Sequence, residues 1–260
     1  MIKLKKIFYR NSVRFLLSSL AVSVAITAMG LLLLPVVSAP VTDGEGLPAL
    51  SEGADRYTFV LDPGHGGEDG GAVGADGTEE KHLNLEIGKC LHDLMLLNGQ
   101  SVLLTRTEDT LLYDYYHDLE DYTGHKKMYD LRNRLKITEQ TDDAVYVGIH
   151  MNKFTDPRYG GLQVYYSPKT PKSNVLAGMI QMSVKNACQP DTNRAVKAAT
   201  SGIYVLNECH TPAVLVECGF LSNPEECHLL NTESYRCKLA TAIFHALCTF
   251  ENTKNDPTDK

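Results

Sequence analysis

Two histidines and two glutamates stand where apolar runs of the sequence give way to polar residues. His65 and His150 each follow a short, strand-like apolar run, Glu217 follows another, and Glu80 begins a helical pattern after a glycine-rich loop. In open α/β sheets, ligands bind beyond the C-terminal ends of the strands, where residues distant in sequence converge. We therefore expect these four side chains to lie close together.

These residue types in combination indicate hydrolytic metal chemistry. Singly, a histidine at a strand end more often caps a loop, and an acid at a helix start interacts with the helix dipole. Together, two histidines and one carboxylate are the protein ligands of many catalytic zinc sites, which leave the fourth position to water. A second carboxylate that does not bind the metal can move a proton from that water to the leaving group. The residues alone thus predict a zinc hydrolase.

Alternating strands and helices are expected to position these side chains. Strands are predicted over residues 57–61, 101–105, 144–149, 161–166, 202–206 and 213–216. Helices are predicted over residues 83–95, 129–138, 174–187 and 232–249, with another beginning at Asn223-Pro224. This order predicts the α/β class, a single domain whose mostly parallel, mixed central sheet is covered by helices on both faces.

Charge and composition limit the classes of partner. Hydrophobic residues make up 43% and charged residues 22% of the chain, which excludes a disordered or fibrous protein. The net charge is −7, yet the first 39 residues hold five basic residues and no acidic one. The remaining chain has 20 basic against 32 acidic residues. Such an acidic body argues against nucleic acid as a partner, because duplex binding requires a basic face.

Residues 1–39 have the organisation of an export signal. Basic residues up to Arg14 precede an apolar stretch over 15–37, and Val37-Ser38-Ala39 has the small-residue pattern of a cleavage site. The stretch is also long enough to span a bilayer, so a cleaved signal peptide and an N-terminal membrane anchor both stay open. In either case the domain lies outside the cytoplasmic membrane and meets it only through this segment. Residues 40–55, with several Gly and Pro, are expected to form a linker.

Seven cysteines could form disulfides in an exported chain. Their number is odd, however, and none belongs to a Cys-x-x-Cys pair. Cys90 and Cys248 occupy apolar positions of helical patterns, where a free thiol behaves as a small hydrophobic side chain. We expect mostly free thiols and leave one or more bridges open.

Four motifs together resemble the N-acetylmuramoyl-L-alanine amidase type 3 family. They are Asp62-Pro63-Gly64-His65-Gly66-Gly67, Glu80-Lys81-His82-Leu83-Asn84-Leu85, Ile149-His150-Met151-Asn152 and Val214-Leu215-Val216-Glu217-Cys218-Gly219-Phe220. The resemblance runs from about residue 59 to 247. We therefore expect a zinc amidase catalytic domain over residues 56–252 and a flexible tail over 253–260.

The resemblance implies that His65, Glu80 and His150 bind Zn²⁺ and that Glu217 is the catalytic acid/base. Strand alternation sends Glu217 and Cys218 to opposite faces, so only one of them can point at the metal. The implied reaction is hydrolysis of the amide between N-acetylmuramic acid and L-alanine in peptidoglycan. The implied partners are glycan strands with stem peptides on the cell-wall side of the membrane, and the need for an activating protein stays open.

The assignment of Glu80 as a metal ligand has two rivals nearby in the sequence. Glu79 directly precedes Glu80, and we choose Glu80 because it occupies the family's Glu-Lys-x-x-Asn-Leu position. His82 is also compatible with a metal, although the family varies at that position.

Arg134 and Asn152 are the predicted substrate-binding residues. Arg134 falls where the family has an arginine on the helix before the second histidine. It pairs either with a carboxylate of the stem peptide or with Glu139 or Asp130 on its own surface, and the sequence leaves both open. Asn152 follows His150 in its motif.

Two other functions are disfavoured by the spacing and presence of the site residues. A zinc carboxypeptidase-like peptidase would carry a His-x-x-Glu pair, whereas His65 and Glu80 are 15 residues apart. A catalytically inactive wall-binding domain would have lost some of the four site residues, yet all are present. Among amidases, a compact domain without an insertion between residues 166 and 202 resembles the spore-cortex enzymes, so cell-wall and spore-cortex remodelling both stay open.

Overall fold

The structure is a computed structural model that describes residues 56–117 and 122–255. The expected leader over 1–39 and the linker over 40–55 lie outside the described residues. Within the described ranges, no helix combines the length and hydropathy needed to cross a membrane. The last helix continues into a 3₁₀ turn at Asn252–Asn255, so the expected tail begins with ordered residues, and 256–260 are not described.

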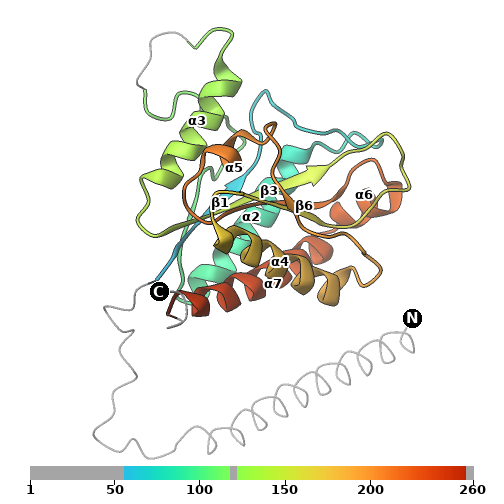
Figure 1. The fold of residues 1–260 in the computed structure, drawn as a ribbon. Helices are drawn as coiled ribbons and strands as arrows, with labels where there is room; N and C mark the ends of the chain where they lie inside the picture. The colour runs from blue at the N-terminus through green and yellow to red at the C-terminus, as the bar shows by residue number, and fades with distance from the viewer. Residues whose placement is uncertain (1–55, 118–121, 256–260) are drawn as a thin grey trace, which may run out of the picture. The chain divides into compact units, whose positions relative to one another are not determined.

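Six strands in the described part of the chain form one mixed sheet in the order β2-β1-β3-β6-β4-β5 (Figure 1). They are β1 (Thr58–Pro63), β2 (Ser101–Leu104), β3 (Ala144–Asn152), β4 (Gln163–Tyr166), β5 (Lys197–Ala198) and β6 (Ala213–Phe220). β1 pairs in parallel with β2 and β3, and β3 pairs in parallel with β6. β4 is antiparallel to β6 and parallel to β5. The predicted α/β class with a mostly parallel, mixed sheet is confirmed.

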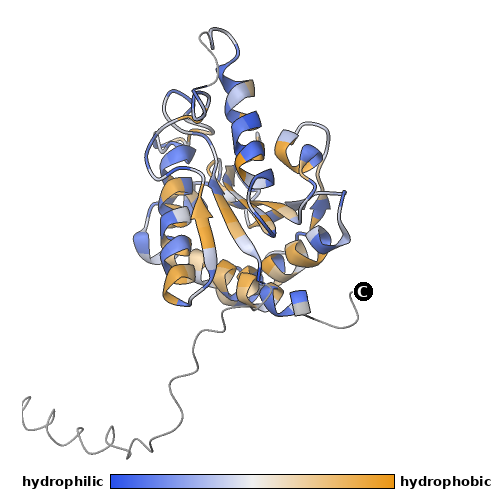
Figure 2. Ribbon diagram, turned by 90° about the vertical axis from the view of Figure 1, so that its left-hand side faces the viewer, coloured by the Kyte–Doolittle hydropathy of each residue, from blue (hydrophilic) through white to orange (hydrophobic). Residues whose placement is uncertain are grey.

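Helices cover both faces of this sheet, as predicted (Figure 1). One face packs against α2 (Glu80–Leu97), α4 (Pro171–Cys188) and α7 (Glu233–Glu251), and the other against α3 (Lys126–Glu139) and α5 (Tyr204–Glu208). The short α6 (Pro224–Leu230) follows β6, and the Asn223 side chain caps its N-terminus. Figure 2 shows hydrophobic strands between helices that carry hydrophilic residues on their outer sides.

Strand alternation divides the core into two layers. Phe59 and Leu61 of β1 pack into the larger apolar cluster beneath α2, α4 and α7. Val60 between them and Tyr146 of β3 pack into a smaller cluster beneath α3 and α5. Because successive strand residues face opposite sides, a strand buried on both faces reads as a continuous apolar run. This accounts for the run predicted at 144–149.

The strand predicted over residues 202–206 is wrong. The chain forms helix α5 there, and Val205 and Leu206 are both buried in the cluster beneath α3 and α5. Neighbouring residues of a strand would point to opposite faces, whereas a helical turn directs both inward. The Asn207 side-chain amide donates to the Ile203 carbonyl over 2.9 Å and supports the turn. The edge strand β5 lies earlier, and its two exposed residues show no apolar alternation.

Candidate metal centre and acid/base site

Three predicted ligands meet at the C-terminal ends of β1 and β3. His65 follows β1, His150 lies near the end of β3, and Glu80 is the first residue of α2. The Oε1 atom of Glu80 lies 3.2 Å from His65 Nε2 and 2.9 Å from His150 Nδ1. The ligand atoms of all three side chains lie within 4.8 Å of one another. The structure therefore brings the predicted set together.

Glycines make this close approach feasible. A Cβ at Gly64 would lie 2.0 Å from His150 Cε1, so any side chain there would displace the imidazole. Gly71 has φ +70°, and a Cβ would lie 2.6 Å from Glu80 Oε2. The glycine-rich motif is thus a steric requirement of the site.

Glu80 is held as an anion between the two histidines. Its side chain is buried, and the backbone N–H groups of Ala72 and Met151 donate to its two oxygens over 2.7 and 3.0 Å. Burial alone would raise the pKa of Glu80, but hydrogen bonds from His150 and His65 and their charges lower it overall. A buried anion flanked by two imidazoles is a donor set suited to a cation.

Asp69 fixes the orientation of His65, a role that the sequence analysis missed. Its Oδ2 lies 3.0 Å from His65 Nδ1, on the side of the ring away from the Nε2 that faces Glu80. Burial would lower the pKa of His65, but Glu80 and Asp69 together raise it. A carboxylate on the outer nitrogen is a common support for a metal-binding histidine. The sequence did offer a signal for this role, because Asp69 is an acidic residue four positions after the motif histidine His65.

Glu217 lies beside the candidate ligands without sharing their hydrogen bonds. It is paired with His150 in the β3–β6 register, and with His65 and His150 it lines a cavity of about 270 Å³. Its Oε2 is buried and has no hydrogen-bond partner. Burial raises the pKa of Glu217 to about 7; the charge of Glu80 also raises it, while His150 and His65 lower it. Such a group can both accept and donate a proton near neutral pH.

Cys218 points away from this cavity. It is buried in the apolar cluster beneath α2, α4 and α7, on the opposite face of the sheet from Glu217. Burial raises the pKa of its thiol. The predicted division between Glu217 and Cys218 is confirmed.

Two buried arginines support the loop that carries His65. Arg134 donates to the carbonyls of Pro63 and His65 over 3.0 and 2.8 Å. Arg106 donates to the carbonyls of Pro63 and Gly64 over 2.8 and 3.0 Å. His65 itself has φ 63°, a left-handed conformation that is costly for a non-glycine residue. The two guanidinium groups thus hold a strained loop in place.

The remaining donors of Arg134 serve two buried carboxylates. Its Nη1 lies 2.5 Å from Asp62 Oδ1 and its Nε 2.8 Å from Asp130 Oδ2. Nη2 is also 3.4 Å from Asp130 Oδ1, so the protein accepts all five N–H groups of this 2%-exposed residue. Of the pairings that the sequence left open, Arg134 makes the one with Asp130. Glu139 instead lies 3.1 Å from His210.

Tyr146 and Thr105 complete the surroundings of Asp62, a buried residue in the lining of the cavity. The Tyr146 hydroxyl donates to Asp62 Oδ2 over 2.6 Å, and the Thr105 hydroxyl donates to Oδ1. Their roles were not predicted from the sequence, although Asp62 belongs to the first motif.

The rival residues and Asn152 lie apart from the cluster. His82 is exposed, and its Nε2 lies 3.3 Å from Glu79, so the rival histidine and the rival glutamate face each other. Asn152 Oδ1 accepts from the Lys153 N–H over 2.7 Å, and Asn152 is not among the residues that line the cavity.

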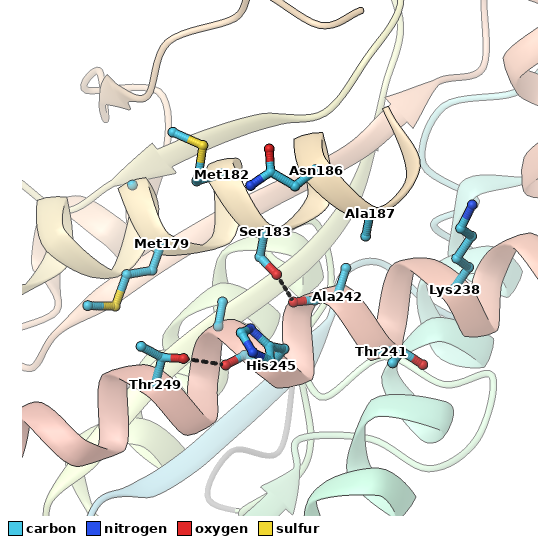
Figure 3. Close-up of a pocket in the computed structure, with 12 residues that line it drawn as sticks. Met179, Met182, Ser183, Asn186, Ala187, Lys238, Thr241, Ala242, His245 and Thr249 are labelled. Atoms are coloured by element: carbon cyan, nitrogen blue, oxygen red, sulfur yellow. Dashed lines mark hydrogen bonds between the residues drawn. The ribbon is translucent and has the colours of Figure 1, made fainter. Parts of the chain in front are cut away.

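A larger hollow of about 780 Å³ lies between α4 and α7 (Figure 3). Met179 and Met182 contribute to its lining, and Ser183 bridges the two helices by donating to the Ala242 carbonyl over 2.7 Å. Lys238 and His245 are the ionisable residues of its lining, which contains no carboxylate. The hollow therefore lacks the set of two histidines and two carboxylates that the smaller cavity region brings together.

Comparison with known proteins identifies similar chains. The family model described as N-acetylmuramoyl-L-alanine amidase matches residues 59–249. The germination-specific N-acetylmuramoyl-L-alanine amidase of Bacillus subtilis is 34% identical over 201 residues, which cover 77% of this chain and 82% of that protein. The amidase AmiA of Escherichia coli is 27% identical over 253 residues, covering 80% of this chain and 81% of its own.

Solved structures show the same similarity. The CwlD amidase from Clostridioides difficile, determined in complex with the GerS lipoprotein, superposes with a TM-score of 0.70 at 37% identity. The alignment covers 76% of this chain and 99% of that one. The amidase AmiC2 of Nostoc punctiforme gives a TM-score of 0.63 at 29% identity, covering 76% and 98% of the two chains.

Proposed function

This chain belongs to the N-acetylmuramoyl-L-alanine amidase family, and from that premise we propose that His65, Glu80 and His150 hold a zinc ion while Glu217 carries the proton during amide hydrolysis. One observation carries the proposal. Glu217, whose buried Oε2 has no hydrogen-bond partner, lines the same cavity as the candidate metal-binding residues His65 and His150. A buried carboxylate without a hydrogen bond is costly and calls for a functional reason.

The donor set fits zinc. Two imidazole nitrogens and one carboxylate oxygen are ligands that zinc takes in catalytic sites, with a remaining position for water. When bound, the metal supplies Lewis-acid polarisation of the substrate carbonyl and acidifies water. Asp69 holds the His65 ring, Arg134 donates to the His65 carbonyl and Arg106 donates to the preceding carbonyl of Gly64, so the protein itself fixes the orientation of this ligand.

Glu217 performs the proton transfers. Its carboxylate takes a proton from the attacking water and then delivers it to the nitrogen of L-alanine as the carbon–nitrogen bond breaks. The products are the free carboxyl group of muramic acid and a stem peptide with a free amino terminus. A pKa raised toward neutrality by burial suits both steps, because the group must accept and later donate the same proton.

The ligand assignment is tested by His150→Ala, with His82→Ala as a matched control. His150→Ala should lose zinc and release no stem peptide, whereas His82→Ala should keep both, since His82 is exposed and paired with Glu79. Metal content is measured by elemental analysis, and products by mass spectrometry of muropeptides from defined peptidoglycan. Full zinc occupancy in His150→Ala would remove His150 from the ligand set.

The proposed binding of substrate by Arg134 is tested by comparing the change in KM with the change in stability in Arg134→Ala. A direct contact would require one of its N–H groups to leave Asp62, Asp130 or the loop carbonyls. In that case Arg134→Ala should raise KM far more than it lowers stability. A large loss of stability with unchanged KM would instead assign Arg134 to the loop alone.

Asn152 is proposed as a substrate contact through its side-chain amide nitrogen, because its Oδ1 already accepts from Lys153. Asn152→Asp keeps that acceptor and removes the donor. It should raise KM and leave zinc content unchanged, and an unaltered KM would exclude the contact.

The proposed substrate is spore-cortex peptidoglycan. Similarity to the germination-specific amidase of Bacillus subtilis supports this choice over the vegetative wall. The purified enzyme should release more stem peptide from cortex than from vegetative peptidoglycan of the same organism. Equal release from both would leave the amidase activity intact and refute the cortical preference.

An extracytoplasmic location is proposed together with a protein partner. The export-like segment over residues 1–39 supports the location, and the complex of the CwlD amidase with the GerS lipoprotein supports a partner. Cell fractionation with protease accessibility tests the location. Affinity capture of the full chain from sporulating cells, with the chain lacking its tag as control, tests the partner.

A further inference from the structure

The thiols of two helices meet on the face of the sheet away from the active-site cavity. α2 and α7 pack side by side there (Figure 1), and Cys90 Sγ on α2 lies 3.6 Å from Cys237 Sγ on α7. All seven cysteines lie within the described residues. Among them, this is the pair whose sulfur atoms touch.

Contacts on both sides of this pair fix the spacing of the two helices. Arg236 Nη2 lies 2.5 Å from Glu86 Oε2, and the Asn98 side chain donates to Cys248 Sγ over 3.6 Å. A disulfide requires the sulfurs to approach to roughly 2.05 Å. The remaining ~1.5 Å is to be closed by rotation of the two cysteine side chains, between helices whose spacing these contacts hold.

We propose that Cys90 and Cys237 form a disulfide site that ties α2 to α7, with another disulfide, of a protein or of a small molecule, as the oxidant. The thiolate of one of the two cysteines attacks one sulfur of the oxidant and releases its first thiol, which leaves a mixed disulfide. The thiolate of the other cysteine then attacks the protein sulfur of that mixed disulfide and expels the second thiol. Two protein thiols are oxidised, one disulfide is reduced to two thiols, and the protons pass to the released thiolates.

The surroundings suit this exchange. Both cysteines are half-buried, so a small oxidant reaches them while neighbouring side chains shield the product. Burial and the neighbouring Cys237 thiol raise the pKa of Cys90 to about 11, so the exchange should be faster at alkaline pH.

The crosslink would stabilise the domain without entering its chemistry. It closes a loop of nearly 150 residues, which removes many conformations from the unfolded chain. It also ties the helix that begins with Glu80 to the last helix of the domain. Neither cysteine lines the cavity at Glu217, so kcat at moderate temperature should be the same in both redox states.

The test compares reduced and oxidised full-length chain. After treatment with oxidised glutathione, non-reducing peptide mapping should find residues 90 and 237 in one crosslinked pair, and free thiols should fall from seven to five. Tm should rise by roughly 5–15 °C, a gain reversed by dithiothreitol. Cys90→Ser and Cys237→Ser should abolish both effects.

Cys248→Ser is the matched control, because Cys248 also faces α2 but contacts an asparagine. It should keep the crosslink and the rise in Tm. If serine at position 90 unfolds the chain, Cys90→Ala carries the same test. A crosslink between other cysteines, or folded protein that keeps all seven thiols under oxidised glutathione, would overturn the proposal.

Discussion

Glu80 and Glu217 are buried carboxylates in one site with opposite surroundings. Glu80 accepts hydrogen bonds from two backbone N–H groups and contacts both histidines, and these histidines keep its pKa below the usual range despite burial. Glu217 leaves one oxygen without a partner, and burial raises its pKa to about 7. Two groups whose environments separate their pKa values in this way are suited to different tasks. One is suited to hold a cation and the other to carry a proton.

The difference arises from the elements that carry the two residues. Glu80 begins a helix, beside a glycine-rich loop whose N–H groups are free to turn toward it. Glu217 lies within β6, between His150 of β3 and Gln163 of β4. No group among the described residues donates to the buried Oε2 of Glu217 in this setting. The same side chain thus becomes anion or proton carrier according to its backbone setting.

The largest effect on zinc binding and activity is expected from Glu80→Gln. The amide keeps the shape of the side chain but loses the charge that a cation requires, so zinc binding and hydrolysis should both be lost. Elemental analysis of the purified variant and muropeptide mass spectrometry measure the two losses. Stoichiometric zinc in Glu80→Gln would contradict the role assigned to Glu80.

Glu217→Gln is the matched substitution on the other carboxylate. It should retain zinc and fold, while kcat falls by roughly 10²–10⁴ because the amide cannot take up and return a proton. Steady-state kinetics and metal content are measured on the same preparation. Wild-type turnover in this variant would refute the proposed mechanism.

Asp62→Asn tests the buried network of Asp62, Arg134 and Tyr146 in the lining of the cavity. Removing one partner of a buried ion pair should lower the free energy of unfolding by about 3–5 kcal/mol near neutral pH. Burial would raise the pKa of Asp62, but Arg134, Thr105 and Tyr146 lower it overall. Its stabilising contribution is therefore complete above the ordinary Asp pKa and is lost as pH falls through the lower folded value.

The difference in stability between wild type and Asp62→Asn should accordingly shrink as pH falls below about 4. Urea unfolding at a series of pH values measures it. Asp156→Asn is the control, because Asp156 pairs with the exposed Arg158 at the surface and should change stability little. A difference that stays constant across the acidic range would show that the Asp62 charge does not stabilise the fold.

Local patterns predicted the sheet, its helices and the meeting of His65, Glu80 and His150. Strand ends are visible in sequence, and parallel strands bring their ends to one edge whatever lies between them. The hydrogen-bond partners within the buried network could not be predicted from the sequence. Asp62 and Arg134, for example, are 72 residues apart and meet only because the chain packs them together. The same holds for Cys90 and Cys237. Residues 202–206 were misread because apolar residues in a short segment suit a strand and a helical turn equally.

The smallest effect on catalysis is expected from Cys218→Ser. Its neighbour in the sequence, Glu217, is expected to have one of the largest effects. Cys218 is adjacent to Glu217 but faces the apolar cluster beneath α2, α4 and α7, where burial raises the pKa of its thiol. A protonated thiol directed away from the cavity cannot serve as a nucleophile. Cys218→Ser should therefore keep wild-type kcat and KM while stability falls by about 1–3 kcal/mol, because a hydroxyl replaces the thiol in an apolar setting. A variant that stays folded and zinc-loaded but loses kcat would make Cys218 part of the chemistry, and Glu217 would no longer act alone.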